Sequence, residues 1–191
     1  MKTHNLAFID TETTGLNPEK HEIIELGCVL VRQIPQAGKG PKLEVIDEFE
    51  YKIRPEHLDV AEPDALRING YTPEKWKDAK PLLEVMEDFA QRTRGAAFVA
   101  HNMAFDLGFV DKAFQRAGVR NLMHYVKIDT ISFAYSKLFH EPKVEKFSLA
   151  ALCEFYGIKN ETAHTALSDA KATFEVFKKM TEEKSAQASL F

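Results

Sequence analysis

The chain has 191 residues, of which 45% are hydrophobic and 28% are charged, and its formal net charge is −4 at pH 7. This length suits one α/β domain, whose core is large enough to need no disulfides. The composition is ordinary for a soluble domain. The acidic balance argues against broad binding of duplex DNA, which relies on many Lys and Arg contacts to phosphate.

Neither the N-terminus nor the cysteines indicate an extracellular or membrane protein. The segment MKTHNLAFID lacks the apolar core and cleavage site of a signal peptide. No stretch approaches the ~20 apolar residues of a membrane span. Cys28 and Cys153 lie in apolar stretches, so we expect buried, reduced thiols rather than metal ligands. We therefore expect a cytoplasmic protein with no membrane partner.

Three strands are predicted in the first third of the chain. Residues 6–10 are an apolar run that ends in acids, residues 23–32 are β-branched and apolar, and residues 45–53 place Phe49 and Tyr51 on one face. Residues 33–43, rich in Gly, Pro and Lys, form the loop at a hairpin tip. The short connections predict that these three strands are antiparallel.

Helices and two further strands are predicted in the rest of the chain. Thr72 followed by Pro73 is typical of a helix start, with an N-cap and Pro at the first helical position. The other predicted elements are helix 82–92, strand 96–100, helix 106–117, strand 125–128 and helices 131–138, 149–156 and 165–179. This order predicts an α/β fold with a five-stranded mixed sheet flanked by helices and with right-handed parallel crossovers.

Asp10 and Glu12 form the first unusual polar feature. Residues two apart share one face of a strand, so the face that carries Phe8 becomes doubly acidic at the strand's end. Adjacent carboxylates beside an apolar ring need a counter-charge, and a hard cation such as Mg²⁺ or Mn²⁺ suits oxygen ligands. The alternative is a strand end with exposed acids in a turn, and the pair alone does not separate the two interpretations.

Asp106 is the second candidate, in the segment HNMAFD. It falls in the first turn of a helix at the carboxyl end of a central strand, where ligand sites of open α/β sheets gather. Asn102 is expected to cap that helix. An acid that favours the positive end of the helix dipole is the alternative explanation for Asp106.

Asp169 and His164 form the third candidate, in the segment HTALSDA. Asp169 lies three residues after Ala166 and four before Thr173, which places it on the core-facing stripe of the last helix. Because an unpaired buried Asp is costly, this position favours a site. His164 is suited to accept a proton near neutral pH, although a lone His is more often a surface or capping residue.

Taken together, these segments resemble the DEDDh 3′–5′ exonucleases, and among them the proofreading epsilon subunits of bacterial replicative DNA polymerases. The resemblance covers about residues 5–180. It implies an RNase H-like fold and two bound Mg²⁺ or Mn²⁺ ions. It also implies hydrolysis of the last phosphodiester, with His164 as general base. The residues to which it assigns catalysis are Asp10, Glu12, Asp106, His164 and Asp169, of which the four acids hold the metal, while Asp129 of KIDT lies near the site.

The same resemblance implies a set of substrate contacts. We expect these at Thr13, Thr14, Gly15, Leu16, Asn69, Asn102 and Phe105. Stacking of Phe105 on a single-stranded base would contribute about 1–3 kcal/mol. Ordinary core packing is an equally open interpretation for Phe105 and Leu16. Asn69, in the segment RINGYT, departs from the family pattern, because proofreading subunits often carry His there.

The C-terminal residues predict a partner. We expect an exonuclease domain over residues 1–180 and a flexible tail over residues 181–191. The tail ends in QASLF, which is similar to the Q-x-[SD]-L-F peptides that bind the bacterial sliding clamp. Gln187, Leu190 and Phe191 are the expected contacts.

The sequence therefore predicts a metal-dependent 3′–5′ exonuclease that trims single-stranded or frayed 3′ DNA ends to 5′-mononucleotides in proofreading or DNA repair. A replicative polymerase is a further expected partner, although the chain's end at Phe191 slightly favours a stand-alone enzyme. Three alternatives remain open: an exoribonuclease of the same family, a non-catalytic adaptor between clamp and polymerase, and an endonuclease with a related sheet.

Overall fold

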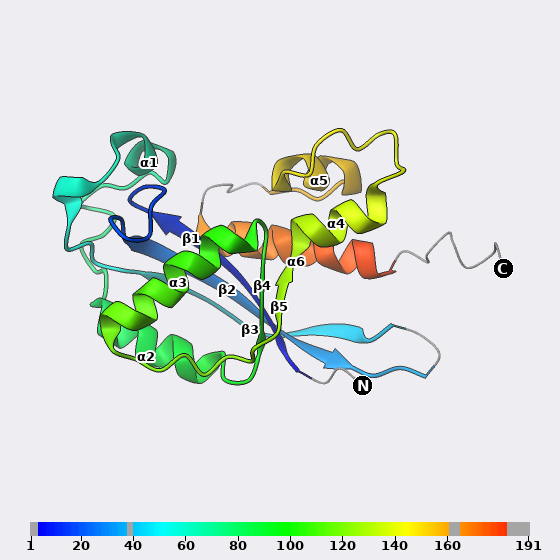
Figure 1. Cartoon of the computed structure of the whole chain (residues 1–191), viewed down its shortest axis with the longest axis horizontal. Helices are drawn as coiled ribbons and strands as arrows, with labels where there is room; N and C mark the ends of the chain where they lie inside the picture. The colour runs from blue at the N-terminus through cyan, green and yellow to red at the C-terminus, as the bar shows by residue number, and fades with distance from the viewer. Residues whose placement is uncertain (1–3, 38–39, 161–164, 183–191) are drawn as a thin grey trace.

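The computed structural model describes residues 4–37, 40–160 and 165–182. Five strands form one mixed sheet in the order β3-β2-β1-β4-β5 (Figure 1). The strands are β1 (Leu6–Thr13), β2 (Ile23–Ile34), β3 (Lys42–Lys52), β4 (Ala97–Ala100) and β5 (Lys127–Asp129). The pairs β1–β2 and β2–β3 are antiparallel, whereas β1–β4 and β4–β5 are parallel. The predicted mixed sheet, with its first three strands antiparallel, is confirmed.

Helices cover both faces of this sheet. The helical elements of the described residues are η1 (Leu58–Val60), α1 (Pro63–Ile68), α2 (Leu82–Arg92), α3 (Met103–Ala117), α4 (Thr130–Leu138), α5 (Leu149–Tyr156) and α6 (Ala166–Glu182). One face packs on α2 and α3, and the other packs on α6, against which α4 and α5 lie (Figure 1). None of the described helices is long and apolar enough to cross a membrane.

Alternate side chains of β1 point to opposite faces of the sheet. Ala7 and Ile9 pack in the core with α2 and α3, whereas Leu6 and Phe8 pack in the core with α6. All four side chains are buried, because β1 lies between β2 and β4 and is covered on both sides. Acids placed beyond Phe8 on the same face are therefore directed toward α6.

Two local predictions are wrong, and one helix is missing from the prediction. Residues 73–78 form turns and not the helix that Thr72 and Pro73 predict. Lys75 N–H does donate to Thr72 Oγ1 at 3.3 Å, as in a cap. The buried Trp76 side chain, however, donates to the Ile24 carbonyl at 2.8 Å and fixes the turn to β2. Packing of one aromatic side chain thus overrides the local helix signal.

Asn102 is the second correction, because it occupies the N-cap position of α3 without a side-chain capping hydrogen bond. Its φ of 62° lies in the left-handed region, which Asn tolerates better than most residues. The third correction is α1, a short helix that was not anticipated. The burial predicted for the two cysteines is confirmed.

Candidate functional site

Asp10, Glu12 and Asp169 come together at the end of β1. One carboxylate oxygen from each lies within 4.8 Å of the other two. Asp10 and Glu12 continue the face of Phe8, and Asp169 lies in the first turn of α6. All three residues are half-buried, so part of the surface of each is exposed to solvent. The structure therefore brings together two segments that are far apart in the chain.

Asp106 is buried beside this cluster and is anchored to β1. Its Oδ1 accepts hydrogen bonds from the Thr11 amide at 3.0 Å and from Thr11 Oγ1 at 2.8 Å. Thr11 separates Asp10 from Glu12 in the chain, so Asp106 is fixed to the strand that carries both acids. The short β4 strand ends at Ala100, and α3 then carries Asp106 in its first turn.

Burial raises the pKa of three of these carboxyl groups, and neighbouring acids add to the effect at Asp10 and Glu12. Burial raises the pKa of Asp10 well above its usual value, and the charges of Asp106 and Asp169 raise it further. Burial, followed by the charges of Glu25 and Asp169, raises the pKa of Glu12 to about 7. Burial also raises the pKa of Asp106 to about 7, against the effect of the Thr11 hydrogen bonds. A divalent cation would relieve this repulsion, so the residues fit such an ion.

Glu25 is a buried acid that the sequence interpretation missed. It pairs with Glu12 across β1 and β2, and only 2% of its surface is exposed. Lys52 Nζ lies 2.8 Å from its Oε2, and the Ala166 amide donates to its Oε1 at 2.9 Å. An acid in the middle of the apolar run 23–32 is the signal that could have identified it, because a central strand buries both faces.

Asn160 is a second residue that the sequence interpretation missed. Its Nδ2 donates to Asp169 Oδ1 at 2.6 Å, and its Oδ1 accepts from Ser168 Oγ at 2.7 Å. It therefore orients a carboxylate of the cluster. No periodicity could have indicated it, because it follows α5 outside any regular element.

The turn after β1 is held by hydrogen bonds within it and to Asn69 and Glu22. Asn69 Nδ2 donates to the Thr13 carbonyl at 3.0 Å, and Thr13 Oγ1 donates to the Gly15 carbonyl at 2.7 Å. Thr14 Oγ1 accepts from the Glu22 amide at 2.9 Å. The side chains of Asn69, Thr13 and Thr14 thus shape the turn. Gly15 is required there, because a Cβ would come within 2.4 Å of a ring carbon of His21.

Leu16 and Phe105 differ in exposure. Leu16 is 73% exposed, so core packing does not explain it. Phe105 is half-buried and lies 4.9 Å from the ring of Phe109, between centroids, in the core under α3. Leu16 is therefore the one of these two apolar side chains that is free to meet a ligand.

Asp129 joins the starts of two helices. Its Oδ1 accepts from the amides of Met103 and Ile131, and its Oδ2 accepts from Ser132 Oγ at 2.7 Å. Burial opposes ionisation, but these hydrogen bonds outweigh it and lower the pKa of Asp129. The carboxylate thus caps α4 and also contacts the first turn of α3.

Four predicted residues lie outside the described residues. They are His164, Gln187, Leu190 and Phe191. Their roles stay predictions from the sequence.

Comparisons with known proteins agree with this geometry. The RNase T model, described as exonuclease, matches residues 7–177. The DNA polymerase III epsilon subunit of Escherichia coli is 35% identical over 182 residues, which cover 91% of this chain and 70% of that protein. The PolC-type DNA polymerase III of Staphylococcus aureus is 32% identical over 183 residues, which cover 96% of this chain but only 12% of that protein.

Solved structures with low identity share the fold. Escherichia coli exonuclease I in complex with a dT13 oligonucleotide has a TM-score of 0.75 and 18% identity, and the match covers 94% of this chain and 41% of that chain. The ExoI/SSB-Ct complex has a TM-score of 0.74 and 18% identity, and the match covers 95% of this chain and 42% of that chain. With a family model that matches residues 7–177, nearly its whole length, the chain belongs to the exonuclease family that this model describes.

Proposed function

We propose that the protein is a metal-dependent 3′–5′ exonuclease that hydrolyses single-stranded or frayed 3′ DNA ends to 5′-mononucleotides in proofreading or repair. One observation carries the proposal: Asp10, Glu12 and Asp169 converge within 4.8 Å on a chain of the exonuclease family. The buried Asp106 adds a fourth carboxyl group beside them. The intact acidic set argues against a non-catalytic adaptor.

The four acids would hold two Mg²⁺ or Mn²⁺ ions. Such ions, when bound, supply positive charge to the phosphodiester and favour the ionisation of water. Asp10, Glu12 and Asp169 offer the ligand oxygens, and Asn160 orients Asp169. We assign the general base to His164, which would take the proton from the attacking water and return it to solvent.

DNA is the proposed substrate. The epsilon subunit is named as a subunit of a DNA polymerase, and the PolC-type relative is named as a DNA polymerase. One neighbouring structure holds a dT13 oligonucleotide. In this chain the exposed Leu16 and the backbone of the turn 13–15 would contact the terminal nucleotide. The exoribonuclease alternative would be favoured instead if RNA were digested faster than DNA of the same sequence in parallel reactions.

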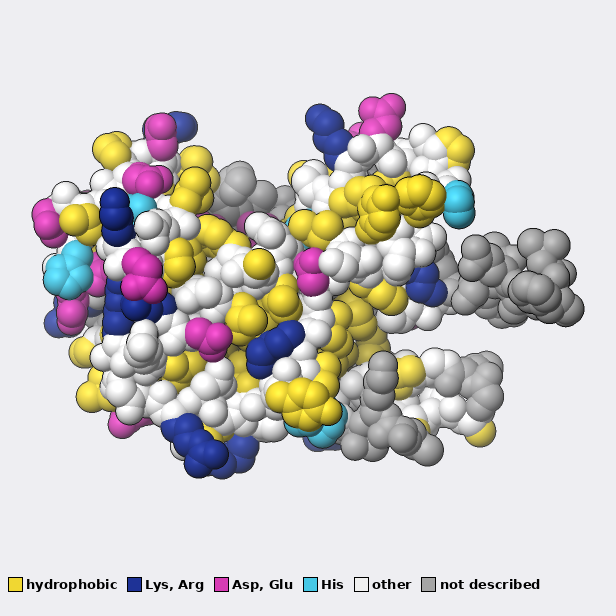
Figure 2. All heavy atoms as spheres, viewed as in Figure 1, with side chains coloured by type: hydrophobic (Ala, Val, Ile, Leu, Met, Phe, Trp, Pro, Cys, Tyr) yellow, Lys and Arg dark blue, Asp and Glu magenta, His cyan; other side chains and the backbone are white. Residues whose placement is uncertain are grey.

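An aromatic patch on α4 supports a single-stranded substrate. Hydrophobic side chains gather on the surface over α4 (Figure 2). Tyr135 of α4 and Phe139, directly after α4, are 52% and 58% exposed, and their ring centroids lie 5.2 Å apart. Exposed rings suit stacking on unpaired bases. Tyr135→Ala should therefore raise KM for a long single strand more than KM for a dinucleotide.

The remaining assignments concern organisation and partners. Residues 1–180 would form the exonuclease domain, and residues 181–191 would bind a bacterial sliding clamp through Gln187, Leu190 and Phe191. A replicative polymerase is a further proposed partner, since the epsilon subunit of Escherichia coli is a subunit of one.

The test is a timed digest of end-labelled DNA. Single-stranded, matched-duplex and 3′-mismatched substrates are incubated with Mg²⁺, Mn²⁺ or EDTA. We expect nucleotides to be lost one at a time from the 3′ end, fastest from single-stranded and mismatched DNA, and no loss in EDTA. Digestion from the 5′ end, or digestion that EDTA leaves unchanged, would contradict the proposal.

A further inference from the structure

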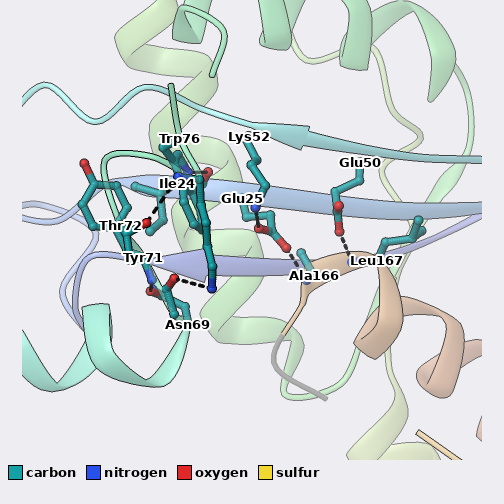
Figure 3. Close-up of polar contacts among 12 residues, drawn as sticks. Ile24, Glu25, Glu50, Lys52, Asn69, Tyr71, Thr72, Trp76, Ala166 and Leu167 are labelled. Atoms are coloured by element: carbon teal, nitrogen blue, oxygen red, sulfur yellow. Dashed lines mark hydrogen bonds and ion pairs between the residues drawn. The ribbon is translucent and has the colours of Figure 1, made fainter. Parts of the chain in front are cut away.

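Two carboxylates from the sheet hold the first turn of α6 (Figure 3). Glu25 Oε1 on β2 accepts a hydrogen bond from the Ala166 amide at 2.9 Å. Glu50 Oε1 on β3 accepts one from the Leu167 amide at 3.0 Å. We call Glu25 and Glu50 the carboxylate clamp.

The carboxylate clamp supplies hydrogen-bond acceptors for the first amides of α6, which in most helices come from a residue next to the helix start. The first amides of a helix have no intrahelical acceptor, and a neighbouring side chain normally caps them. Here the acceptors lie 141 and 117 residues away in the sequence. An ionised acid is also favourable at the positive end of the helix dipole. Burial raises the pKa of Glu50, whereas its hydrogen bond with the Leu167 amide lowers it. The position of α6 is thus tied to the sheet at its first turn.

Gly27 lets the two backbones meet. A Cβ at Gly27 would come within 2.3 Å of the Ala166 carbonyl carbon and of the Leu167 amide nitrogen. Gly27 lies between the clamp residues, two positions from Glu25 along β2 and directly opposite Glu50 on β3. The backbone of β2 at Gly27 therefore contacts the backbone of the first turn of α6, beside the two hydrogen bonds from Glu25 and Glu50.

Glu25 is itself fixed from the opposite side. Lys52 Nζ forms an ion pair with it at 2.8 Å and lies 3.7 Å from the centre of the Trp76 ring (Figure 3). Trp76 is anchored to the Ile24 carbonyl. A buried carboxylate is tolerated only when it is paired and hydrogen-bonded, and Glu25 satisfies both conditions. Its position is therefore set by β3 and by the turn around Trp76, neither of which carries a residue of the acidic cluster.

We propose that the carboxylate clamp positions Asp169 for cation binding. Asp169 lies two residues after Leu167 in the same helical turn, and Glu25 lies opposite Glu12 on the neighbouring strand. The clamp thus fixes the distance between the segment that carries Asp169 and the strand that carries Asp10 and Glu12. Glu25 and Glu50 are positioning residues, and only the consequence for DNA hydrolysis rests on the function proposed above.

Mn²⁺ titration of the full chain by calorimetry tests the clamp without relying on activity. Glu50 is exposed, so Glu50→Ala should fold. It should weaken Mn²⁺ binding by about tenfold or more, as loss of an outer partner of a metal site typically does. Glu50→Gln keeps an oxygen acceptor for the Leu167 amide and should restore binding to within about threefold of the unsubstituted protein.

Glu48→Ala is the matched control. Glu48 lies on the same strand and contacts α6 through an ion pair with Lys171 at 2.6 Å, beyond the first turn. An exposed pair of this kind contributes little, so Mn²⁺ affinity should not change. Equal losses in Glu48→Ala and Glu50→Ala would mean that any tether of α6 suffices, and would overturn the proposal.

Two further measurements separate the possible failures. If Glu50→Ala lowers the melting temperature but binds Mn²⁺ normally, the clamp serves stability alone and the proposal is wrong. The proposal is also wrong if the unsubstituted protein binds no Mn²⁺. If Glu50→Ala loses Mn²⁺ affinity while the unsubstituted protein digests no DNA, the role of the carboxylate clamp is supported and the proposed function is wrong.

In an active enzyme, Glu50→Ala should lower kcat more than it changes KM, and added Mn²⁺ should restore part of the rate.

Discussion

Asp106 accepts both the amide and the hydroxyl hydrogen bond of Thr11, the residue that separates Asp10 from Glu12. This double contact joins α3 to β1 at the acidic cluster. It also favours the ionised form of a buried carboxyl group, whose pKa is nevertheless raised to about 7 by burial. Thr11 is not an acid, but its hydrogen bonds affect the charge of Asp106 and therefore of the site.

Thr11→Val should shift the pH dependence of Mn²⁺ binding. Loss of the hydroxyl hydrogen bond removes a contact that lowers the pKa of Asp106, so this pKa should rise in the metal-free protein and the profile of Mn²⁺ affinity should move to higher pH. A hydrogen bond to a charged group contributes about 1.5–3 kcal/mol, so Mn²⁺ affinity at pH 7 should fall by roughly tenfold. Thr11→Ser keeps the hydroxyl and should retain the original profile. Identical profiles for all three proteins would refute this role.

The metal-free protein should lose stability as the pH rises toward neutral. The pKa of Glu12 is raised from 4.5 to about 7, so between these values the unfolded chain releases a proton that the folded chain retains. The free energy of unfolding contributed by this group is complete below about pH 4.5 and declines up to pH 7. Denaturant titrations in EDTA should show the decline, and Glu12→Gln should flatten it. Parallel curves for the two proteins would contradict the raised pKa.

Asp10→Ala and His164→Ala should fail in different ways. Removal of Asp10 should weaken Mn²⁺ binding and lower kcat by orders of magnitude while the fold stays intact. Removal of the proposed base should lower kcat by about 10²–10⁴-fold and leave Mn²⁺ affinity unchanged. Calorimetry, circular dichroism and single-turnover digestion together distinguish the two results. Full exonuclease activity in either variant would exclude the assigned role.

A peptide of residues 182–191 should bind a bacterial sliding clamp. Leu190 and Phe191 end a polar segment and would gain free energy by burial in an apolar pocket. Deletion of both should abolish binding and leave digestion of short oligonucleotides unchanged. If calorimetry detects no heat of binding at high micromolar concentrations of the peptide, the sliding clamp is not a partner.

Periodicity accounts for what the sequence predicts well. The period of two in β1 placed Asp10 and Glu12 on one face, and the period of 3.6 placed Asp169 on the inner side of α6. Both patterns depend only on neighbouring residues, so they can be identified without knowledge of the fold. The convergence of these segments was predicted by family resemblance, and the short distances among the three carboxylates agree with it.

Long-range polar contacts explain what the sequence does not predict. Glu25 binds an amide 141 residues away, and Thr11 binds a carboxylate 95 residues away. Such hydrogen bonds produce no periodic pattern of residue types in the sequence, because a backbone amide is present at nearly every position. The turn around Trp76 was mispredicted for a related reason, since its anchor on β2 is distant in the sequence.

A crystal structure of the protein soaked in Mn²⁺, with anomalous data collected at the manganese edge, tests the central claim most directly. We predict anomalous peaks among the carboxylate oxygens of Asp10, Glu12, Asp106 and Asp169, and their loss in Asp169→Ala. A map that shows no manganese among these oxygens would contradict the account.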